Sequence, residues 1–219
     1  MSDVQIITLG EHVDYWDRLG WRDAFSSSVF SERQSAYAAA VFHTGGIYTP
    51  QLVVDGMLQA VGSDASAVRR VLGEAARRPK ATVSVATSAP EDDRLRVDVR
   101  VELGAAVAAA GSADLLVAVA EDGLVSQVQR GENGGRTLRH AAVVRSLTTI
   151  GALPKGERSI SANARIAISR DWPLAHLRIV ALLQERQSRR ILGAAQRPVS
   201  AAAAGAHASL PPRNDRSQR

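Results

Sequence analysis

The 219-residue sequence predicts two folded units, an α/β unit followed by an antiparallel β-sandwich. Residues 94–103 alternate strictly between apolar and charged side chains, which is typical of a strand with one buried and one solvated face. Helical patterns occur before Pro79, whereas short strand patterns dominate after it. Apolar residues make up 45% of the chain and aromatic residues only 4%, so Val, Leu, Ile and Ala must form most of the core.

The α/β unit is predicted over residues 1–79. Its elements, in order, are a strand over 4–13, a helix that ends at Gly45–Gly46, a β-hairpin of strands 51–54 and 57–61 that turns at Asp55–Gly56, and a helix closed by Pro79. Ser31, with Gln34 three residues later, forms a capping-box pattern for the first helix. Ser63 or Asp64 is expected to cap the second helix.

The all-β unit is predicted over residues 80–198, with its boundary near residues 78–81. Strands are expected at 82–87, 94–103, 113–120, 160–168, 176–185 and 189–196. Short strands separated by turn residues at this spacing are typical of an antiparallel sandwich. From residue 199 to residue 219, Ala, Ser, Pro and Arg dominate without periodicity, so this tail is predicted to be disordered.

Composition and charge exclude several classes of protein. The net charge is +5, but lysine occurs only at Lys80 and Lys155 and the arginines are scattered, so nucleic acid is not expected as a partner. No apolar run reaches the ~18 residues that a membrane-spanning helix needs, so no transmembrane segment is predicted. The sequence contains no cysteine, which excludes disulfides, thiolate zinc sites and dithiol chemistry within this chain.

Three sequence motifs together carry a family resemblance. They are His-Val-Asp-Tyr-Trp-Asp-Arg-Leu-Gly-Trp at 12–21, Tyr-Thr-Pro-Gln-Leu-Val-Val-Asp-Gly at 48–56 and Gly-Glu-Asn-Gly-Gly-Arg-Thr-Leu-Arg-His at 131–140. In this combination the chain resembles the domain of unknown function 1223 family, bacterial exported thioredoxin-like proteins, from about Ile6 to Arg197. The resemblance implies an α/β plus all-β fold: a thioredoxin-like domain, incomplete at its N-terminus, followed by a β-sandwich-like domain.

The resemblance also implies that a strand and a helix bearing a Cys-x-x-Cys pair precede the first residue of this chain. In the thioredoxin-like order that strand lies between the strands expected at 4–13 and 51–54. Without it, the two strands would face a gap in which each unsatisfied buried backbone group costs about 1–3 kcal/mol. Either these strands close directly on one another, or the given start is not the natural one. We expect the natural chain to start further upstream.

The candidate binding surface consists of His12, Asp14, Tyr15, Trp16, Tyr48, Thr49 and Pro50. The resemblance implies a cis peptide bond before Pro50, which would leave the Thr49 backbone free to pair with an extended peptide; the alternative is a trans proline that starts a strand. His12 and Asp14 would share a face of the first strand, as a hydrogen-bonded pair or as two ligands of an incomplete metal site. Tyr15 and Trp16, with Trp21, would form an aromatic platform or cover the edge of a small core.

The Gly-rich loop at 131–136 lacks the Gly-Lys-Ser/Thr ending of a phosphate loop. It is expected either to dock against the first domain or to be a plain surface turn, with backbone amides and Arg136 forming an anion nest as a further alternative. The candidate interdomain residues are Glu132, Asn133, Arg136 and His140. No Gly-x-Ser-x-Gly elbow is present, so a hydrolase is not expected.

These observations predict a non-catalytic module that binds an extended peptide or protein, with no cofactor and no metal. The alternative is a truncated form of an exported thiol–disulfide oxidoreductase-like protein whose Cys-x-x-Cys segment lies upstream. A weaker third hypothesis is a basic structural protein of the cell envelope. The resemblance implies a periplasmic or secreted location, whereas the chain shows no signal peptide and would be cytoplasmic if its start is genuine.

Overall fold

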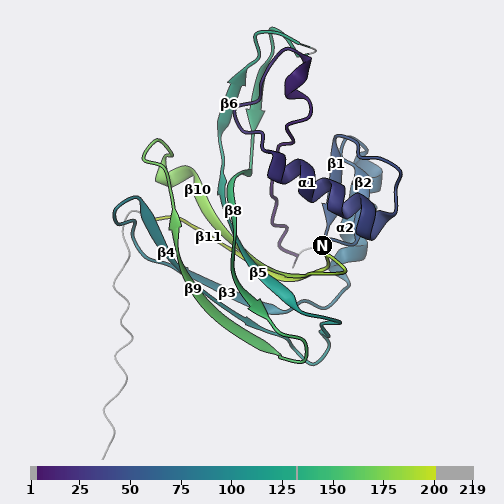
Figure 1. The fold of residues 1–219 in the computed structure, drawn as a ribbon, viewed down its shortest axis with the longest axis vertical. Helices are drawn as coiled ribbons and strands as arrows, with labels where there is room; N and C mark the ends of the chain where they lie inside the picture. The colour runs from purple at the N-terminus through teal and green to yellow at the C-terminus, as the bar shows by residue number, and fades with distance from the viewer. Residues whose placement is uncertain (1–3, 132, 201–219) are drawn as a thin grey trace, which may run out of the picture.

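The computed structural model describes residues 4–131 and 133–200, which form a mostly β protein with two short α-helices and several antiparallel sheets (Figure 1). No helix in these two ranges is long and apolar enough to cross a membrane. Of the tail predicted to be disordered, only Val199 and Ser200 are described, and residues 201–219 lie outside the described residues. Val199 is buried and its N–H donates to the Leu177 carbonyl, so the packed unit extends past residue 198.

Two antiparallel sheets pack face to face around the main core. The four-stranded sheet has the order β11-β10-β5-β8, with β5 Ala113–Glu121, β8 Val143–Leu153, β10 Leu177–Glu185 and β11 Ile191–Pro198. The three-stranded sheet has the order β3-β4-β9, with β3 Thr82–Thr87, β4 Arg94–Glu102 and β9 Ser159–Ala167. Leu95, Val97 and Val99 of β4 share one buried cluster with Leu115, Val117 and Val119 of β5 and Ile179, Ala181 and Leu183 of β10.

Burial explains why the strands of the two sheets differ in sequence pattern. Strand β4 alternates because its inner residues are buried and its outer residues, such as Arg96 and Arg100, are exposed. Strand β5 is buried at every position except Asp114, because its second face is covered as well. Ala118, on that second face, packs with Phe30 and Val180. The outer face of the four-stranded sheet is therefore a platform on which N-terminal elements sit.

The N-terminal elements form a small layer on this platform. They are η1 Asp17–Leu19, α1 Ser28–Tyr37, a π-helical turn η2 Ala38–Phe42, β1 Gln51–Val54, β2 Leu58–Val61 and α2 Ala65–Ala76. Strands β1 and β2 pair only with each other and pack on α2 through Val54, Ala60, Val71 and Ala75. Asp64 caps α2 by accepting from the Ser66 and Ala67 amides, which confirms one of the two predicted caps.

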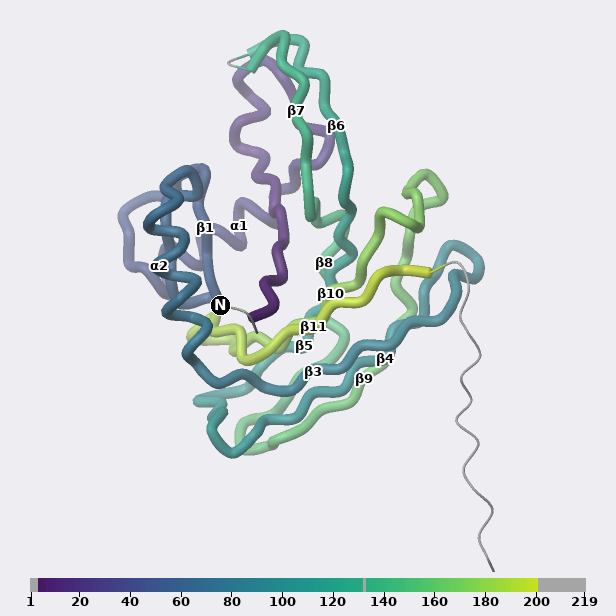
Figure 2. Tube along the Cα trace, turned by 180° about the vertical axis from the view of Figure 1, so that it is seen from behind, coloured from purple at the N-terminus to yellow at the C-terminus, as the bar shows by residue number. Residues whose placement is uncertain are grey.

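A second hairpin extends the large sheet away from its core. Strands β6 Leu124–Gln127 and β7 Thr137–His140 form this hairpin, which lies between β5 and β8 in the chain and is called the arm below. Elsewhere, the short 3-10 helix η3 Leu174–His176 precedes β10. Seen from either side, the arm rises beside the segment that contains η1 (Figures 1 and 2). An added Cβ on Gly131 would lie 3.3 Å from the Leu19 carbonyl oxygen, so the two segments are in contact.

Two predictions for the N-terminal unit are wrong. Residues 4–13 form no strand: Gly10 makes a single parallel bridge to Val143, and the residues before it have no neighbouring strand to pair with. The first helix is not capped by a Ser31–Gln34 box. Ser27 is its N-cap and accepts from the Val29 amide, whereas the Ser31 hydroxyl donates to Asp14.

Candidate functional site

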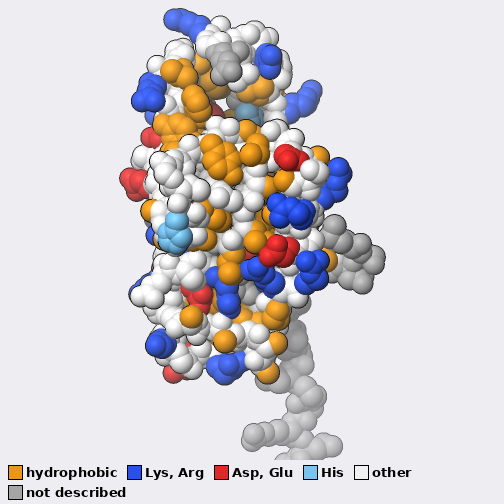
Figure 3. All heavy atoms as spheres, turned by 90° about the vertical axis from the view of Figure 1, so that its right-hand side faces the viewer, with side chains coloured by type: hydrophobic (Ala, Val, Ile, Leu, Met, Phe, Trp, Pro, Cys, Tyr) orange, Lys and Arg blue, Asp and Glu red, His pale blue; other side chains and the backbone are white. Residues whose placement is uncertain are grey.

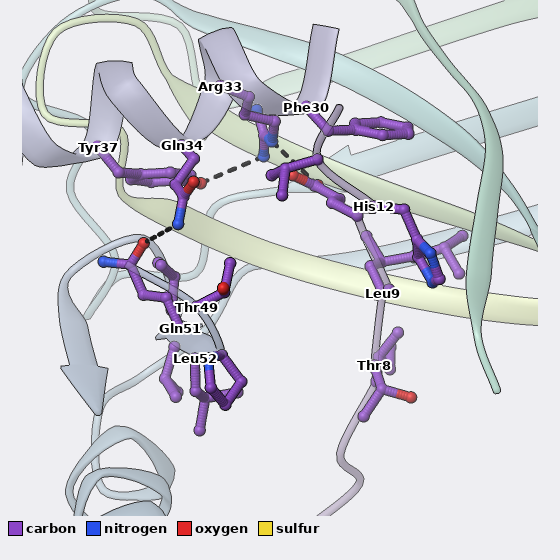
Figure 4. A pocket seen from close by; sticks show the side chains of 18 of the residues that line it. Thr8, Leu9, His12, Phe30, Arg33, Gln34, Tyr37, Thr49, Gln51 and Leu52 are labelled. Atoms are coloured by element: carbon purple, nitrogen blue, oxygen red, sulfur yellow. Dashed lines mark hydrogen bonds and ion pairs between the residues drawn. The ribbon is translucent and has the colours of Figure 1, made fainter. Parts of the chain in front are cut away.

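A groove of about 1230 Å³ separates the N-terminal segment from β1. One wall is residues 4–10, and the opposite wall is residues 49–55. Tyr37 of α1 lines a third side, and Val180 and Ile191 of the platform line the base. Figure 4 shows Thr8 and Leu9 across the groove from the wall that carries Leu52, beneath α1. This space is referred to as the groove.

The wall formed by β1 presents an unpaired strand edge to the groove. The Pro50 carbonyl accepts from the Gly62 amide at 2.7 Å and the Val54 carbonyl from the Met57 amide at 3.0 Å, so backbone groups of even-numbered residues point towards β2. Those of Gln51 and Val53 must then point the opposite way, because directions alternate along an antiparallel strand. Within the described residues nothing bonds to the backbone groups of Gln51 and Val53 on this edge.

The opposite wall is also unpaired along most of its length. Within residues 4–9 of the described chain, the one backbone group with a hydrogen-bond partner is the Thr8 carbonyl, which accepts from Arg178 at 3.4 Å. Ile7 and Leu9 pack against the platform, whereas Val4 and Ile6 are 43% and 51% exposed. Gly10 ends the wall: its N–H donates to Ala142 at 2.7 Å, which fixes the segment to the start of β8.

Four residues of the predicted binding surface meet at one end of the groove. The Trp16 indole N–H donates to the Thr49 hydroxyl at 3.0 Å, and the bond between Thr49 and Pro50 is cis, which confirms that prediction. The Tyr15 ring packs against Trp16 at a tilt of 52°, with ring centroids 5.5 Å apart. Trp16 is 49% exposed and lines the groove, so part of the indole is accessible from it.

Gln34 of α1 ties this end of the groove together. Its side-chain amide accepts from the Tyr15 hydroxyl at 2.9 Å and donates to the Tyr48 carbonyl at 2.8 Å and to the Gln51 side chain at 3.0 Å. Tyr48 in turn donates to Gln59 of β2 at 3.2 Å. The sequence analysis assigned Gln34 to a cap and missed this role, because nothing in an isolated helix pattern indicates which residues its polar face will meet.

His12 and Asp14 do not share a face, contrary to the prediction, because the segment is not a strand. His12 Nδ1 lies 2.6 Å from the Asp23 carboxylate, whereas Asp14 is held by Ser31. Burial alone would raise the pKa of Asp23, but hydrogen bonds from His12 and from the Phe25 amide outweigh it and lower the pKa. No group of three or more metal-ligating side chains occurs in the described ranges.

Several of the charges that line the groove are paired. Arg33 lies 3.0 Å from Glu11 and Lys80 lies 2.9 Å from Asp55. Arg78 lies 2.7 Å from Glu74, which does not itself line the groove. Burial raises the pKa of Glu11, and the Arg33 guanidinium opposes this rise. The groove therefore presents little uncompensated charge along its middle. On the side of the molecule that carries α1 and α2, hydrophobic side chains gather in the upper half (Figure 3).

Of the predicted arm residues, Asn133 lines the groove, whereas Arg136 and His140 do not. Asn133 and Arg136 are exposed and contact each other at 3.5 Å, while Glu132 lies outside the described residues. His140 is 3.0 Å from the Ser126 hydroxyl, and its ring is 5.2 Å from that of His12. Burial, together with the neighbouring His12, lowers the pKa of His140. An interdomain role for these residues stays a prediction.

Sequence reasoning also missed the polar contacts that fasten α1 to the platform. Gln184 of β10 is 3% exposed, accepts from Arg33 at 2.8 Å and donates to the Tyr37 hydroxyl at 2.6 Å. A glutamine inside the apolar run of β10 was the one available signal, since a buried amide needs partners.

Fold and site together define a mainly antiparallel β protein with a small helical layer and an open groove. The chain belongs to the family described as protein of unknown function DUF1223, which matches residues 1–184. A comparison with curated proteins found no match.

Two solved structures share this fold. Protein AGR_C_4864 from Agrobacterium tumefaciens is 23% identical, with a TM-score of 0.63 over 89% of this chain and 80% of that one. HBP35 of Porphyromonas gingivalis is 12% identical, with a TM-score of 0.59 over 84% of this chain and 63% of that one. At these identities the likeness concerns the fold alone.

Proposed function

We propose that this protein is a thioredoxin-like scaffold without redox cysteines, and that it binds an extended peptide or protein segment in the groove without catalysing a reaction. The unpaired edge of β1, open to the groove at Gln51 and Val53, is the observation that carries the proposal. An open edge next to a groove is a common means by which proteins take up extended peptides.

The size and the lining of the groove support a peptide rather than a small molecule. A volume of about 1230 Å³ exceeds the roughly 300–1,000 Å³ of typical small-molecule sites. Val4, Ile6 and Trp16 are 43%, 51% and 49% exposed along it, which is unusual for large apolar side chains that share one groove. Cysteine is missing from the sequence, and disulfide exchange requires thiolates, so this chain's own residues cannot supply that reaction.

The test uses an unfolded protein as a source of extended segments. Fluorescein-labelled, reduced and carboxymethylated α-lactalbumin is titrated with the full chain, and anisotropy reports binding. Ile6→Arg places an unpaired charge in the groove and should weaken binding by about tenfold or more, equivalent to about 1.4 kcal/mol. Val125→Arg is the matched control, because Val125 is similarly exposed, at 48% against 51%, and does not line the groove.

Saturable binding that Ile6→Arg weakens and Val125→Arg leaves unchanged is the expected result. Equal effects of the two variants would place binding elsewhere on the surface. No binding at protein concentrations of about 1 mM, which corresponds to a free energy weaker than about −4 kcal/mol, would overturn the proposal.

A further inference from the structure

We infer that the bound segment enters the groove as a β-strand that pairs with β1 on one side and with residues 4–9 on the other. The inference rests on the proposed function and specifies its geometry and ligand class. The ligand is an extended, uncharged segment in which apolar residues alternate with small polar ones.

Both walls of the groove have unpaired backbone groups to which an inserted strand could bond. Gln51 and Val53 point their N–H and C=O groups into the groove, and residues 4–9 offer a further run of free backbone groups opposite them. A single strand inserted between the two walls would pair on both of its edges. Each hydrogen bond formed by a partly buried backbone group adds to the binding free energy, so pairing with two walls at once favours this mode over side-chain contacts alone.

The side chains on either side of β1 predict the alternation. Leu52 and Val54 face α2, so every second residue of a strand added beside β1 would also face α2. Leu72 and Ala76 of α2 line the groove there, which favours apolar ligand side chains at those positions.

The other face of β1 has polar surroundings and favours different ligand residues. Gln51 projects to the side of α1, where it accepts from Gln34 at 3.0 Å. Ligand residues on this face would lie near an amide network and near the Tyr37 ring, which favours Ser, Thr or similar side chains. A charged residue is disfavoured on either face, because Glu11 and Asp55 are already neutralised by Arg33 and Lys80.

The experiment uses amide hydrogen exchange, because alternation along β1 gives an internal control. The probe is a pool of acetylated peptides of about eight residues, since a strand spans ~3.3 Å per residue, with Val, Ile, Leu or Phe alternating with Ser or Thr. Saturation with this pool should slow exchange of the Gln51 and Val53 amides about tenfold or more. The Leu52 and Val54 amides already face β2 and should change much less.

Two proline variants provide a second readout. Val53→Pro removes one N–H from the groove edge and no β1–β2 hydrogen bond, and should weaken peptide binding about tenfold or more. Val61→Pro is the matched control: Val61 lies opposite Gln51 on β2, so its N–H points away from both β1 and the groove. Circular dichroism confirms that both variants fold, and the exchange experiment on the unaltered protein decides the question if either does not.

The outcomes separate this inference from the proposed function. Peptide binding that protects Gln51 and Val53 supports the inserted strand. Binding of the peptides without that protection, or binding of carboxymethylated α-lactalbumin but not of the peptides, overturns the inserted strand and leaves the binding function standing. No binding of either probe overturns both.

Discussion

Replacing Gly56 by alanine should loosen the wall of the groove that β1 forms. Gly56 turns the β1–β2 hairpin with φ 68°, and an added Cβ would lie 1.9 Å from the Arg189 carbonyl oxygen in the turn between β10 and β11. Next to it, the Asp55 carbonyl accepts from the Ile191 amide at 2.9 Å. This contact fixes the tip of the hairpin to the platform, so the variant must push the two turns apart.

The expected cost has two parts. Left-handed backbone strain at a residue with a Cβ costs about 1–2 kcal/mol. Separating the turns also breaks the hydrogen bond between Ile191 and Asp55, at about 1–3 kcal/mol if either group is left buried without a partner. Gly56→Ala should therefore lower the free energy of unfolding by about 2–5 kcal/mol, and since each kcal/mol shifts Tm by about 2–4 °C in a chain of this size, the drop is large enough to measure.

Gly135→Ala provides the control that isolates the contact. Gly135 has a similar φ of 79°, but an added Cβ there would meet nothing within 4 Å. Gly135→Ala should lower the free energy of unfolding only by the cost of backbone strain, about 1–2 kcal/mol, as measured by urea unfolding followed by tryptophan fluorescence. If Gly56→Ala costs no more than Gly135→Ala, the hairpin is not held by the platform and the argument for a fixed groove wall fails.

Three further predictions test other parts of the structure. Phe30→Ala should destabilise the protein by about 3–5 kcal/mol in urea unfolding, because Phe30 is buried between α1 and the platform, and a loss below ~1 kcal/mol would contradict that packing. Trp16→Phe and Thr49→Val each remove the same exposed hydrogen bond, so a double-mutant cycle should give a coupling of about 0.5–1 kcal/mol, and additive effects would show that the bond does not form in solution. The pKa of His140 is lowered below its ordinary 6.5, so the unfolded chain takes up this proton first as the pH falls. Tm should therefore decrease below pH 6.5, and less so in His140→Gln; identical pH profiles would rule out this linkage.

Most strands of the large core could be predicted, because the order of apolar and polar residues in each strand indicates which of its faces are buried. Strand β3 was predicted with its observed bounds, and β4 extends from Arg94 to Glu102 where the alternation runs from 94 to 103. Strand β8 was missed. Its pairing with β5 shifts register at two places, between Leu115 and Leu116 and between Val119 and Ala120, and each shift interrupts the period-2 pattern that would have revealed the strand.

The N-terminal segment shows where prediction from local sequence fails. Residues 4–9 have the composition of a strand, but a strand exists only where a neighbour pairs with it. The same absence of a neighbour opens the groove, so the error at this segment and the candidate site have one cause. Direct closure of this segment on β1, one of the two expected possibilities, does not occur in the described residues, where β1 pairs with β2 alone.

The groove stays open because its two walls are fastened independently to the same platform. On one side Gly10 bonds to Ala142 and Val144 at the start of β8, at 2.7 and 2.9 Å. On the other side Asp55 bonds to Ile191 at the start of β11. Strands β5 and β10 lie between these two anchors in the sheet order β11-β10-β5-β8, so the rigid sheet sets the distance between the walls. Closing the groove would require at least one of these anchors to break, whereas filling it with a strand requires neither.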